Sequence, residues 1–259
     1  MISGTPTAGA ANFTVQVRDS ASRTATKAFA ITVISTTITL TNVPDTMQPA
    51  QQVAIGLTVS SAPSNPISGT LNLSFTSSSV VPLDDPTVMF SNSLKTVNFT
   101  IPANSTVATF PAGTMLLTGT VSGTVVVKAT IPQNGTTDVP VKTVIVPKTV
   151  PMLTNVSAAR ISGGLRVQVT GYSPERQVIN VDFGFDVKTS SGTQRVTLSR
   201  GVQQDFDGWY KSGASSAFGS SFVFEQLFNV QGDNSMINSV TVSLTNSQGS
   251  GTANSAQFR

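Results

Sequence analysis

The sequence contains no cysteine and no histidine among its 259 residues. Without cysteine the chain has no disulfides, no thiol nucleophiles and no thiolate metal ligands, so core packing alone has to stabilise the fold. Without histidine it lacks the commonest general base and transition-metal ligand, which excludes a Ser-His-Asp triad and His-bound zinc or iron. These absences argue against an enzyme, and we predict a non-catalytic protein with no metal and no cofactor.

Charge and long apolar runs are also scarce. Charged residues make up 10% of the chain, and the net charge of +3 divides into +2 over residues 1–35, zero over 36–148 and +1 over 149–259. No basic patch emerges, so we expect no nucleic-acid partner. No run of about 18 apolar residues occurs, and small polar residues follow Met1. We therefore expect no membrane insertion, and any signal peptide would lie upstream of this chain.

Serine, threonine and β-branched residues are abundant instead, and 39% of residues are hydrophobic. This composition favours twisted sheets over amphipathic helices and argues against disorder. The length suits two complete domains and a fragment, at roughly 100 to 150 residues per domain. We predict an all-β chain of tandem antiparallel sandwiches with an incomplete N-terminal module, divided into residues 1–35, 36–148 and 149–259.

Residues 3–33 carry the clearest strand pattern, and we expect three β-strands there. Over 12–17 and again over 27–34, apolar residues alternate with polar ones, as in half-buried strands. Small and polar residues at 18–23 supply a hairpin connection. A fragment this short cannot normally bury a core by itself. We therefore expect its apolar face to be completed by another segment.

The same stretch resembles a known module. IleSerGlyThrProThr at 2–7 is followed by PheThrValGlnValArgAsp at 13–19 and ThrLysAlaPheAlaIleThrVal at 26–33. These phrases resemble the carboxy-terminal half of bacterial immunoglobulin-like (Ig-like) domains. The resemblance implies a sandwich module used for spacing and adhesion, with no catalytic residues. It also implies that the chain begins in mid-domain. Residues 1–35 would then pair with upstream strands or a neighbouring molecule, or alternatively pack against residues 36–148.

The rest of the chain gives regularly spaced strand candidates, typical of a sandwich. In the middle region they are 37–40, 52–59, 69–75, 95–101, 119–130 and 139–146. A Pro-bounded stretch at 146–151 predicts the last domain boundary. Beyond it the candidates are 164–170, 178–187, 194–199, 221–230 and 237–244. Residues 93–106, 118–130 and 239–253 resemble segments of multidomain surface proteins from soil bacteria such as acidobacteria.

The last region also holds the densest aromatic cluster, which includes the chain's single tryptophan. On one interpretation Trp209 fills the sandwich core or pins a loop across its end. On the other, Trp209 and Tyr210 stack on sugar rings while Asp205 and Asp207 accept hydrogen bonds from sugar hydroxyls. These four residues are the candidate ligand-binding site. The cluster comprises Phe206, Trp209, Tyr210, Phe218, Phe222, Phe224 and Phe228.

Two pairs of nearby aspartates could in principle bind a metal ion. AspPheAspGly at 205–208 resembles the start of a calcium loop but lacks the further ligands and distal glutamate of an EF-hand. Asp84 and Asp85 precede Pro86. We interpret both pairs as turn residues that bond the local backbone. Nothing in the sequence places two carboxylates on facing strands, as glycoside hydrolysis would need.

Together these features predict a structural or adhesion segment of a large secreted or cell-surface modular bacterial protein. One alternative is a carbohydrate-binding module that serves a separate enzyme domain, with polysaccharide as its partner. A second is a subunit of an extracellular filament that uses residues 1–35 for strand complementation. Exposure of Trp209 separates the first alternative from the spacer, and concentration-dependent polymers would mark the second.

Overall fold

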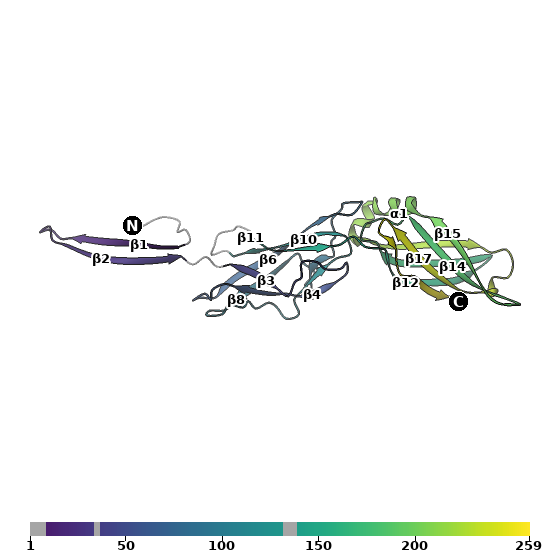
Figure 1. The fold of residues 1–259 in the computed structure, drawn as a ribbon, viewed down its shortest axis with the longest axis horizontal. Coiled ribbons are helices and arrows are strands. Elements are labelled where there is room, and N and C mark those ends of the chain that lie inside the picture. Colours follow the sequence, from purple (N-terminus) through teal and green to yellow (C-terminus); the bar gives the residue numbers. More distant parts are fainter. Residues whose placement is uncertain (1–8, 34–36, 132–138) are drawn as a thin grey trace.

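The structure is a computed structural model that describes residues 9–33, 37–131 and 139–259. An N-terminal hairpin is followed by two β-sandwiches in a row, so the chain is elongated (Figure 1). Two separate hydrophobic cores lie within it. One is built from residues between Leu40 and Val146, and the other from residues between Val156 and Phe258 together with Val81. The all-β, tandem-sandwich fold class predicted from the sequence is confirmed.

The hairpin consists of β1 (Gly9–Arg18) and β2 (Thr24–Val33), paired antiparallel in a sheet of their own. Phe13 lies opposite Phe29, and their rings stack with centroids 5.6 Å apart. Asp19 closes the turn by accepting hydrogen bonds from the backbone of Ala21 and Arg23. Two of the three strands predicted over residues 3–33 are present. The first would fall within residues 1–8, outside the described residues.

The middle sandwich packs a four-stranded sheet, in the order β11-β10-β6-β8, against the shorter sheets β4-β9-β7 and β3-β5. Period-two burial along β10 places Val125, Val127 and Ala129 in the core. The strands are β3 (Ile38–Thr41), β4 (Gln52–Ala54), β5 (Gly56–Val59), β6 (Ile67–Ser77), β7 (Val88–Phe90), β8 (Thr96–Ile101), β9 (Met115–Thr118), β10 (Gly123–Thr130) and β11 (Val139–Val146).

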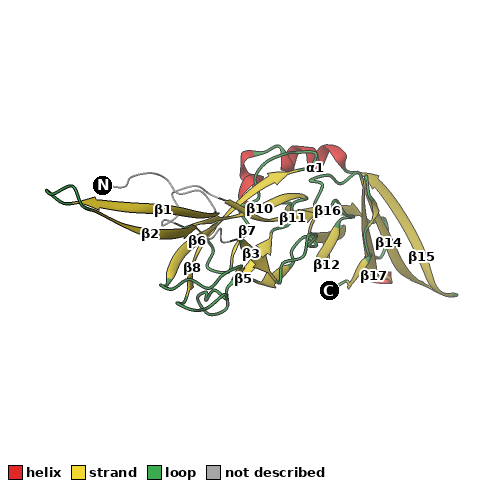
Figure 2. Cartoon of the chain, turned by 60° about the vertical axis from the view of Figure 1, so that its left-hand side comes forward, coloured by secondary structure: helices red, strands yellow, loops and turns green. Residues whose placement is uncertain are grey.

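The third sandwich packs the sheet β12-β13-β16 against a five-stranded sheet in which β15, β14, β17 and β18 are neighbours and β19 also pairs with β17. Figure 2 shows α1 at the end of it that adjoins the middle sandwich. Its elements are β12 (Met152–Ile161), β13 (Gly164–Tyr172), β14 (Asn180–Thr189), β15 (Gly192–Gly201), α1 (Gln203–Tyr210), η2 (Gly213–Phe218), β16 (Ser221–Asn229), η3 (Asn234–Met236), β17 (Ile237–Asn246), β18 (Gly249–Ser250) and β19 (Asn254–Gln257).

The structure departs from the sequence-based strand map in a few places. Strands β7, β9, β12 and β19 were not predicted, and neither was α1. The strand expected over 119–130 begins only at Gly123. Gly119 has a φ of +67°, a left-handed conformation that ends β9 and turns the chain before β10.

Candidate functional site

Helix α1 carries the candidate residues of the aromatic cluster and closes one end of the third core. Phe206 and Tyr210, spaced i and i+4, form its buried face. The Phe206 ring meets Phe222 edge-on at 4.9 Å between centroids. Tyr210 donates its hydroxyl to the Ser220 carbonyl oxygen at 2.8 Å. Burial raises the pKa of Tyr210, so its hydroxyl is a neutral structural donor.

The position of Tyr210 corrects one part of the carbohydrate hypothesis. The side chain has no exposed surface, because α1 turns it toward the core. Its ring therefore offers no face to a ligand in this structure, and the stacking role assigned to it does not hold. The core-filling role that the sequence suggested for Trp209 is performed by Tyr210.

Trp209 is half-buried and lies at the surface of the same cluster. Its indole Nε1 donates to the Ser221 carbonyl oxygen at 3.0 Å, and its ring is tilted against Phe218 at 6.0 Å between centroids. A shallow pocket of about 220 Å³ lies beside it, lined by Phe218, Ser221, Phe222 and Val223 as well as Trp209. Part of the indole face therefore remains accessible from the solvent.

The two candidate carboxylates already have partners. Asp205 accepts a hydrogen bond from Arg200 at 2.8 Å, and Asp207 pairs with Lys211 one helical turn later at 3.0 Å. Asp205 and Trp209 line one small pocket together, whereas Asp207 is not among its lining residues. A sugar hydroxyl at Asp205 would compete with the Arg200 guanidinium.

A second site, which sequence reasoning missed, lies where the two sandwiches meet. Arg176 is only 1% exposed and belongs to the loop between β13 and β14. Its guanidinium donates to the main-chain oxygens of Val81 at 2.8 Å, Leu83 at 2.6 Å and Asp84 at 2.8 Å, all in the middle sandwich. Its Nε donates to the Gly219 carbonyl oxygen at 3.0 Å. One side chain thus joins a loop of each sandwich.

The backbone of Arg176 is strained, with a φ of +51°. A left-handed residue with a side chain costs on the order of 1 kcal/mol or more, and it persists only when its surroundings impose it. Burial lowers the pKa of Arg176, while the charge of Asp85 acts in the opposite direction. Because a guanidinium stays protonated in proteins, the junction holds a permanent positive charge.

Asp85, which has no exposed surface, organises the middle sandwich's side of the junction. Oδ1 accepts from the backbone and hydroxyl of Thr87 at 2.9 and 2.6 Å. Oδ2 accepts from the backbone of Thr120 at 2.7 Å and of Val121 at 2.9 Å. Both oxygens are therefore occupied by donors, which a cation would have to displace. The neighbouring Asp84 carboxylate pairs with Lys95 at 2.7 Å.

Further hydrogen bonds cross the junction directly. Ser220 donates its backbone N–H to the Thr120 hydroxyl at 2.8 Å and its own hydroxyl to the Thr120 carbonyl oxygen at 2.7 Å. Ser122 donates through both its backbone and its hydroxyl to the Pro174 carbonyl oxygen, each at 3.0 Å. Val81, from the middle sandwich, packs into the third core. The two sandwiches therefore share both polar and apolar contacts.

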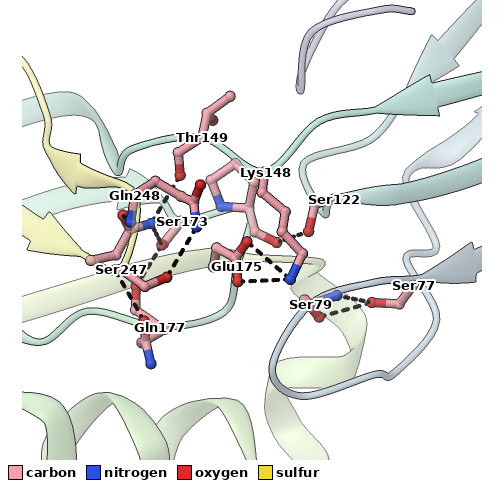
Figure 3. A network of polar contacts seen from close by, with 12 residues as sticks. Ser77, Ser79, Ser122, Lys148, Thr149, Ser173, Glu175, Gln177, Ser247 and Gln248 are labelled. Atoms are coloured by element: carbon pink, nitrogen blue, oxygen red, sulfur yellow. Dashed lines mark hydrogen bonds and ion pairs between the residues drawn. The ribbon is translucent and has the colours of Figure 1, made fainter.

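Glu175 completes the junction, and Figure 3 shows Lys148 reaching its carboxylate. Glu175 is 1% exposed, and the Lys148 Nζ lies 3.4 Å from each of its oxygens. Oε1 is buried without a hydrogen-bond partner, so the ion pair alone offsets its desolvation. The Glu175 carbonyl oxygen accepts from Val80 at 3.0 Å. The side chain of Glu175 thus contacts the segment between β11 and β12, and its backbone contacts the middle sandwich.

Within residues 9–33, 37–131 and 139–259 no three acidic side chains gather closely enough to hold a metal ion. No helix in that part of the chain is long and apolar enough to span a membrane. The junction can hold two domains in one orientation, and the Trp209 pocket can receive a small apolar or ring-shaped group.

No protein-family model matches the chain, and no curated protein matches it. Among solved structures it is similar to the FN1–FN3 domains of chicken CNTN1, at 15% identity and a TM-score of 0.29. That match covers 81% of this chain, which spans 61% of the CNTN1 chain. It is also similar to the calcium-binding domain CBD12 of CALX1.1, at 9% identity and a TM-score of 0.30, covering 80% of this chain and 78% of that one.

At these low identities and TM-scores, similarity to the two structures supports no conclusion about function. Calcium binding is a property of the CALX1.1 domain and is not transferred to this chain. The resemblance of residues 93–106, 118–130 and 239–253 to soil-bacterial surface proteins stays a prediction. Function therefore has to be argued from the chain's own residues.

Proposed function

We propose that this chain is a rigid, non-catalytic spacer segment of a secreted or cell-surface modular bacterial protein. The observation that supports this best is the buried Arg176, which donates to main-chain oxygens of both sandwiches. Tandem domains in one chain normally move relative to one another unless their interface is large and hydrophobic, and here Val81 of the middle sandwich packs into the third core. Here the interface is bonded from several loops at once, which favours one fixed orientation.

The linker supports the same function. Only residues 147–151 separate β11 from β12, and Pro147 and Pro151 bound this stretch. Proline fixes φ near −65° and so stiffens the connection. Asn246 also holds the linker from the third sandwich by donating to the Thr149 carbonyl oxygen at 2.9 Å. A stiff, anchored linker transmits the orientation of one sandwich to the next.

The test is a distance distribution between the sandwiches. The chain has no cysteine, so Leu94→Cys and Ser190→Cys give one spin label in each sandwich without background labelling. We expect one narrow distance peak from pulsed electron paramagnetic resonance, broadened by Arg176→Lys because lysine lacks the planar fork of donors. Arg166→Lys, at an exposed arginine of the third sandwich, is the matched control. A broad or double-peaked distribution in the parent chain would overturn the rigid spacer.

A carbohydrate-binding module is the second candidate, and the pocket beside Trp209 favours it. Phe218 is 54% exposed and Val223 is 66% exposed at its rim, and exposed aromatic faces stack on sugar rings. The test is a polysaccharide and glycan panel, with and without calcium, using the parent chain, Trp209→Ala and Phe218→Ala. Binding that both variants lose would support this candidate. Silence across the panel, with indole fluorescence unchanged by any glycan, would contradict it.

A further inference from the structure

In the third sandwich the edge strands of the two sheets meet along two sides. We call each of these sides a seam, and one seam is closed. There β12 and β19 run side by side, with a bridge between Ala158 and Phe258. The Arg160 N–H donates to the Arg259 carbonyl oxygen at 3.0 Å. The Arg160 guanidinium also donates to the Phe258 carbonyl oxygen at 2.7 Å. Main-chain bonds therefore seal this side of the core.

The opposite seam, between β15 and β16, is open. No main-chain hydrogen bond joins these two edge strands within the described part of the chain. Only side chains bridge them, where Arg200 donates to Gln226 and to Asp205 near α1. An apolar groove of about 340 Å³ lies between the same two strands. The residues that line it include Phe185, Val196, Leu198, Leu227 and Phe228.

The groove lies where a three-stranded sheet faces a five-stranded one. On β15, Val196 pairs with Phe185 and Leu198 pairs with Phe183 of the neighbouring strand β14. Both phenylalanines are buried, so Val196 and Leu198 face the core side of their sheet. They are nevertheless 41% and 47% exposed, because nothing beyond β16 covers β15. A strand added beside β16 would lie over them and close the seam.

The N-terminal hairpin has the complementary surface. Phe13, Val15, Val17 and Phe29 share one face with Lys27, which lies opposite Val15 and places its Nζ 5.4 Å from the centroid of the Phe29 ring. Thr14, Gln16 and Arg18 lie on the other face. On the apolar face Val17 is 65% exposed and Phe29 is 42% exposed. They belong to neither sandwich core. An isolated two-stranded hairpin is marginally stable in water, so this face needs a cover.

The two surfaces cannot meet within one chain. They lie at opposite ends of the elongated molecule, with the middle sandwich between them (Figure 1). Four residues separate the end of β2 from the start of β3, and they span at most about 14 Å when fully extended. The eleven residues of β6 alone extend over about 36 Å. A contact between the hairpin and the groove therefore requires two molecules.

We propose that the hairpin of one copy docks beside β16 of a second copy, with its apolar face over Val196 and Leu198. The strands match in length, with nine residues in β16 and ten in β1, and along β1 apolar side chains alternate with polar ones from Phe13 to Val17. Charge is complementary too, because cations outnumber anions in the hairpin while Glu225 of β16 has no ion pair within the described residues. The added strand extends a sheet through main-chain bonds.

Assembly of this kind is open-ended. The two contacting surfaces differ and lie at opposite ends, so each added copy presents a fresh hairpin and a fresh groove. The inference rests on the proposed spacer function and deepens it by naming the partner, a second copy of this chain. Head-to-tail addition would turn a short spacer into a long one.

The test uses two blocked variants measured by sedimentation velocity. Val15→Lys with Val17→Lys blocks the hairpin, and Val196→Lys with Leu198→Lys blocks the groove. All four side chains are exposed, so the sandwiches should fold as in the parent chain. We expect the parent chain to grow beyond its 26.9 kDa monomer as concentration rises, and each variant to stay monomeric. Leu94→Lys, at another exposed apolar position, should assemble like the parent chain.

Mixing the two variants is the decisive arm. One intact hairpin and one intact groove remain, so the mixture should form dimers and nothing larger. A parent chain that stays monomeric up to about 1 mM, a concentration at which even contacts of about −4 kcal/mol are half formed, would overturn the proposal. So would polymers formed by either variant alone, or a mixture that stays monomeric.

A cross-linking arm keeps the proposal testable if a lysine variant fails to fold. Thr14→Cys and Glu225→Cys, placed in separate chains, should be joined by a short thiol cross-linker, whereas Leu94→Cys with Glu225→Cys should not. Absence of the first product would count against the contact. The interdomain distance distribution of the hairpin-blocked variant separates the two proposals. A narrow peak without assembly defeats only the head-to-tail contact, and a broad peak with assembly defeats only the rigid spacer.

Discussion

The two connections along this chain are built in opposite ways. Between the hairpin and the middle sandwich, the described residues share no hydrophobic core and no main-chain hydrogen bond. Between the middle and third sandwiches, Arg176, Glu175 and Ser220 cross a buried, bonded junction. The difference shows that proximity in sequence does not set the coupling between modules. What sets it is whether buried polar groups of one module find their partners in the next.

The largest effect should come from removing the Arg176 side chain. Arg176→Ala removes the charged donor shared by the carbonyl oxygens of Val81, Leu83, Asp84 and Gly219, although the Val81 oxygen keeps the Ser79 hydroxyl and the Leu83 N–H. The loss of these charge-assisted bonds should lower the free energy of unfolding by about 3–5 kcal/mol. Calorimetry should then show the two sandwiches melting separately instead of together. Arg176→Lys should fall between the parent chain and Arg176→Ala. An unchanged single transition in Arg176→Ala would mean that the junction does not couple the sandwiches.

Next in size is Asp85→Asn, which tests the middle sandwich's half of the junction. One carboxylate oxygen becomes an amide nitrogen facing N–H donors, so we expect a loss of about 1.5–3 kcal/mol, the range for hydrogen bonds to charged groups. Urea unfolding measures it. Asp84→Asn, whose carboxylate is exposed at the surface, is the control and should change stability by less than about 1 kcal/mol. Equal losses in the two variants would contradict the assigned role.

Gly219→Ala should have a smaller effect at the same place. Gly219 has a φ of +62°, and a Cβ there would lie 2.5 Å from the Thr120 hydroxyl and 2.7 Å from Asp85 Oδ1. We expect a cost of about 1–3 kcal/mol from strain and the displaced loop, with a broader interdomain distance peak. At Gly213 a Cβ meets nothing within 4 Å, so Gly213→Ala should change neither quantity.

An ion pair outside both connections gives a pH-dependent comparison. The hydrogen bond from Ser239, together with Arg195, lowers the pKa of Asp186. The stability this provides is present above the ordinary carboxyl pKa of about 4 and is lost as the pH falls through the lower folded value. Asp186→Asn should therefore be less stable than the parent chain at pH 7 and match it in strong acid. A difference that persists in strong acid would contradict this cause.

The smallest effect should come from the hairpin. Phe13→Ala removes the ring that stacks on Phe29 but touches neither sandwich core. The sandwiches should keep their melting temperature, with changes within about 0.5 kcal/mol, as for surface substitutions. The hairpin amides should exchange faster with deuterium. A clear drop in the melting temperature would show that the hairpin supports the middle sandwich and would end the contrast between the two connections.

The sequence was sufficient for strands whose burial alternates over many residues. Strand β14 was predicted because Val181, Phe183 and Phe185 alternate with polar residues, and all three are buried. Strands β7 and β9 have three and four residues, too few for a period to stand out. Helix α1 includes Gly208 and has no side-chain cap, so the usual start signal is missing. The i, i+4 spacing of Phe206 and Tyr210 was the one signal that could have revealed it.

The junction could not be predicted from sequence for a different reason. Asp85 meets Thr120 across 35 residues, and Arg176 reaches Val81 across 95. The first pairing depends on how the middle sandwich folds and the second on how the two sandwiches sit together, and no local pattern encodes either. A single arginine among polar neighbours also looks like a surface residue by composition. For the aromatic cluster, sequence reasoning located the right segment but could not tell which ring faced inward.

All the hydrogen bonds that Arg176 donates to the middle sandwich go to main-chain oxygens. Every residue type supplies a carbonyl oxygen, so residues 83 and 84 can be substituted without losing these bonds as long as the backbone of their loop keeps its conformation. The arginine itself has no substitute with the same fork of donors. Among chains descended from a common ancestor, this joint should therefore appear as one persistent arginine facing a variable loop, a pattern that a search based on matching pairs of side chains would overlook.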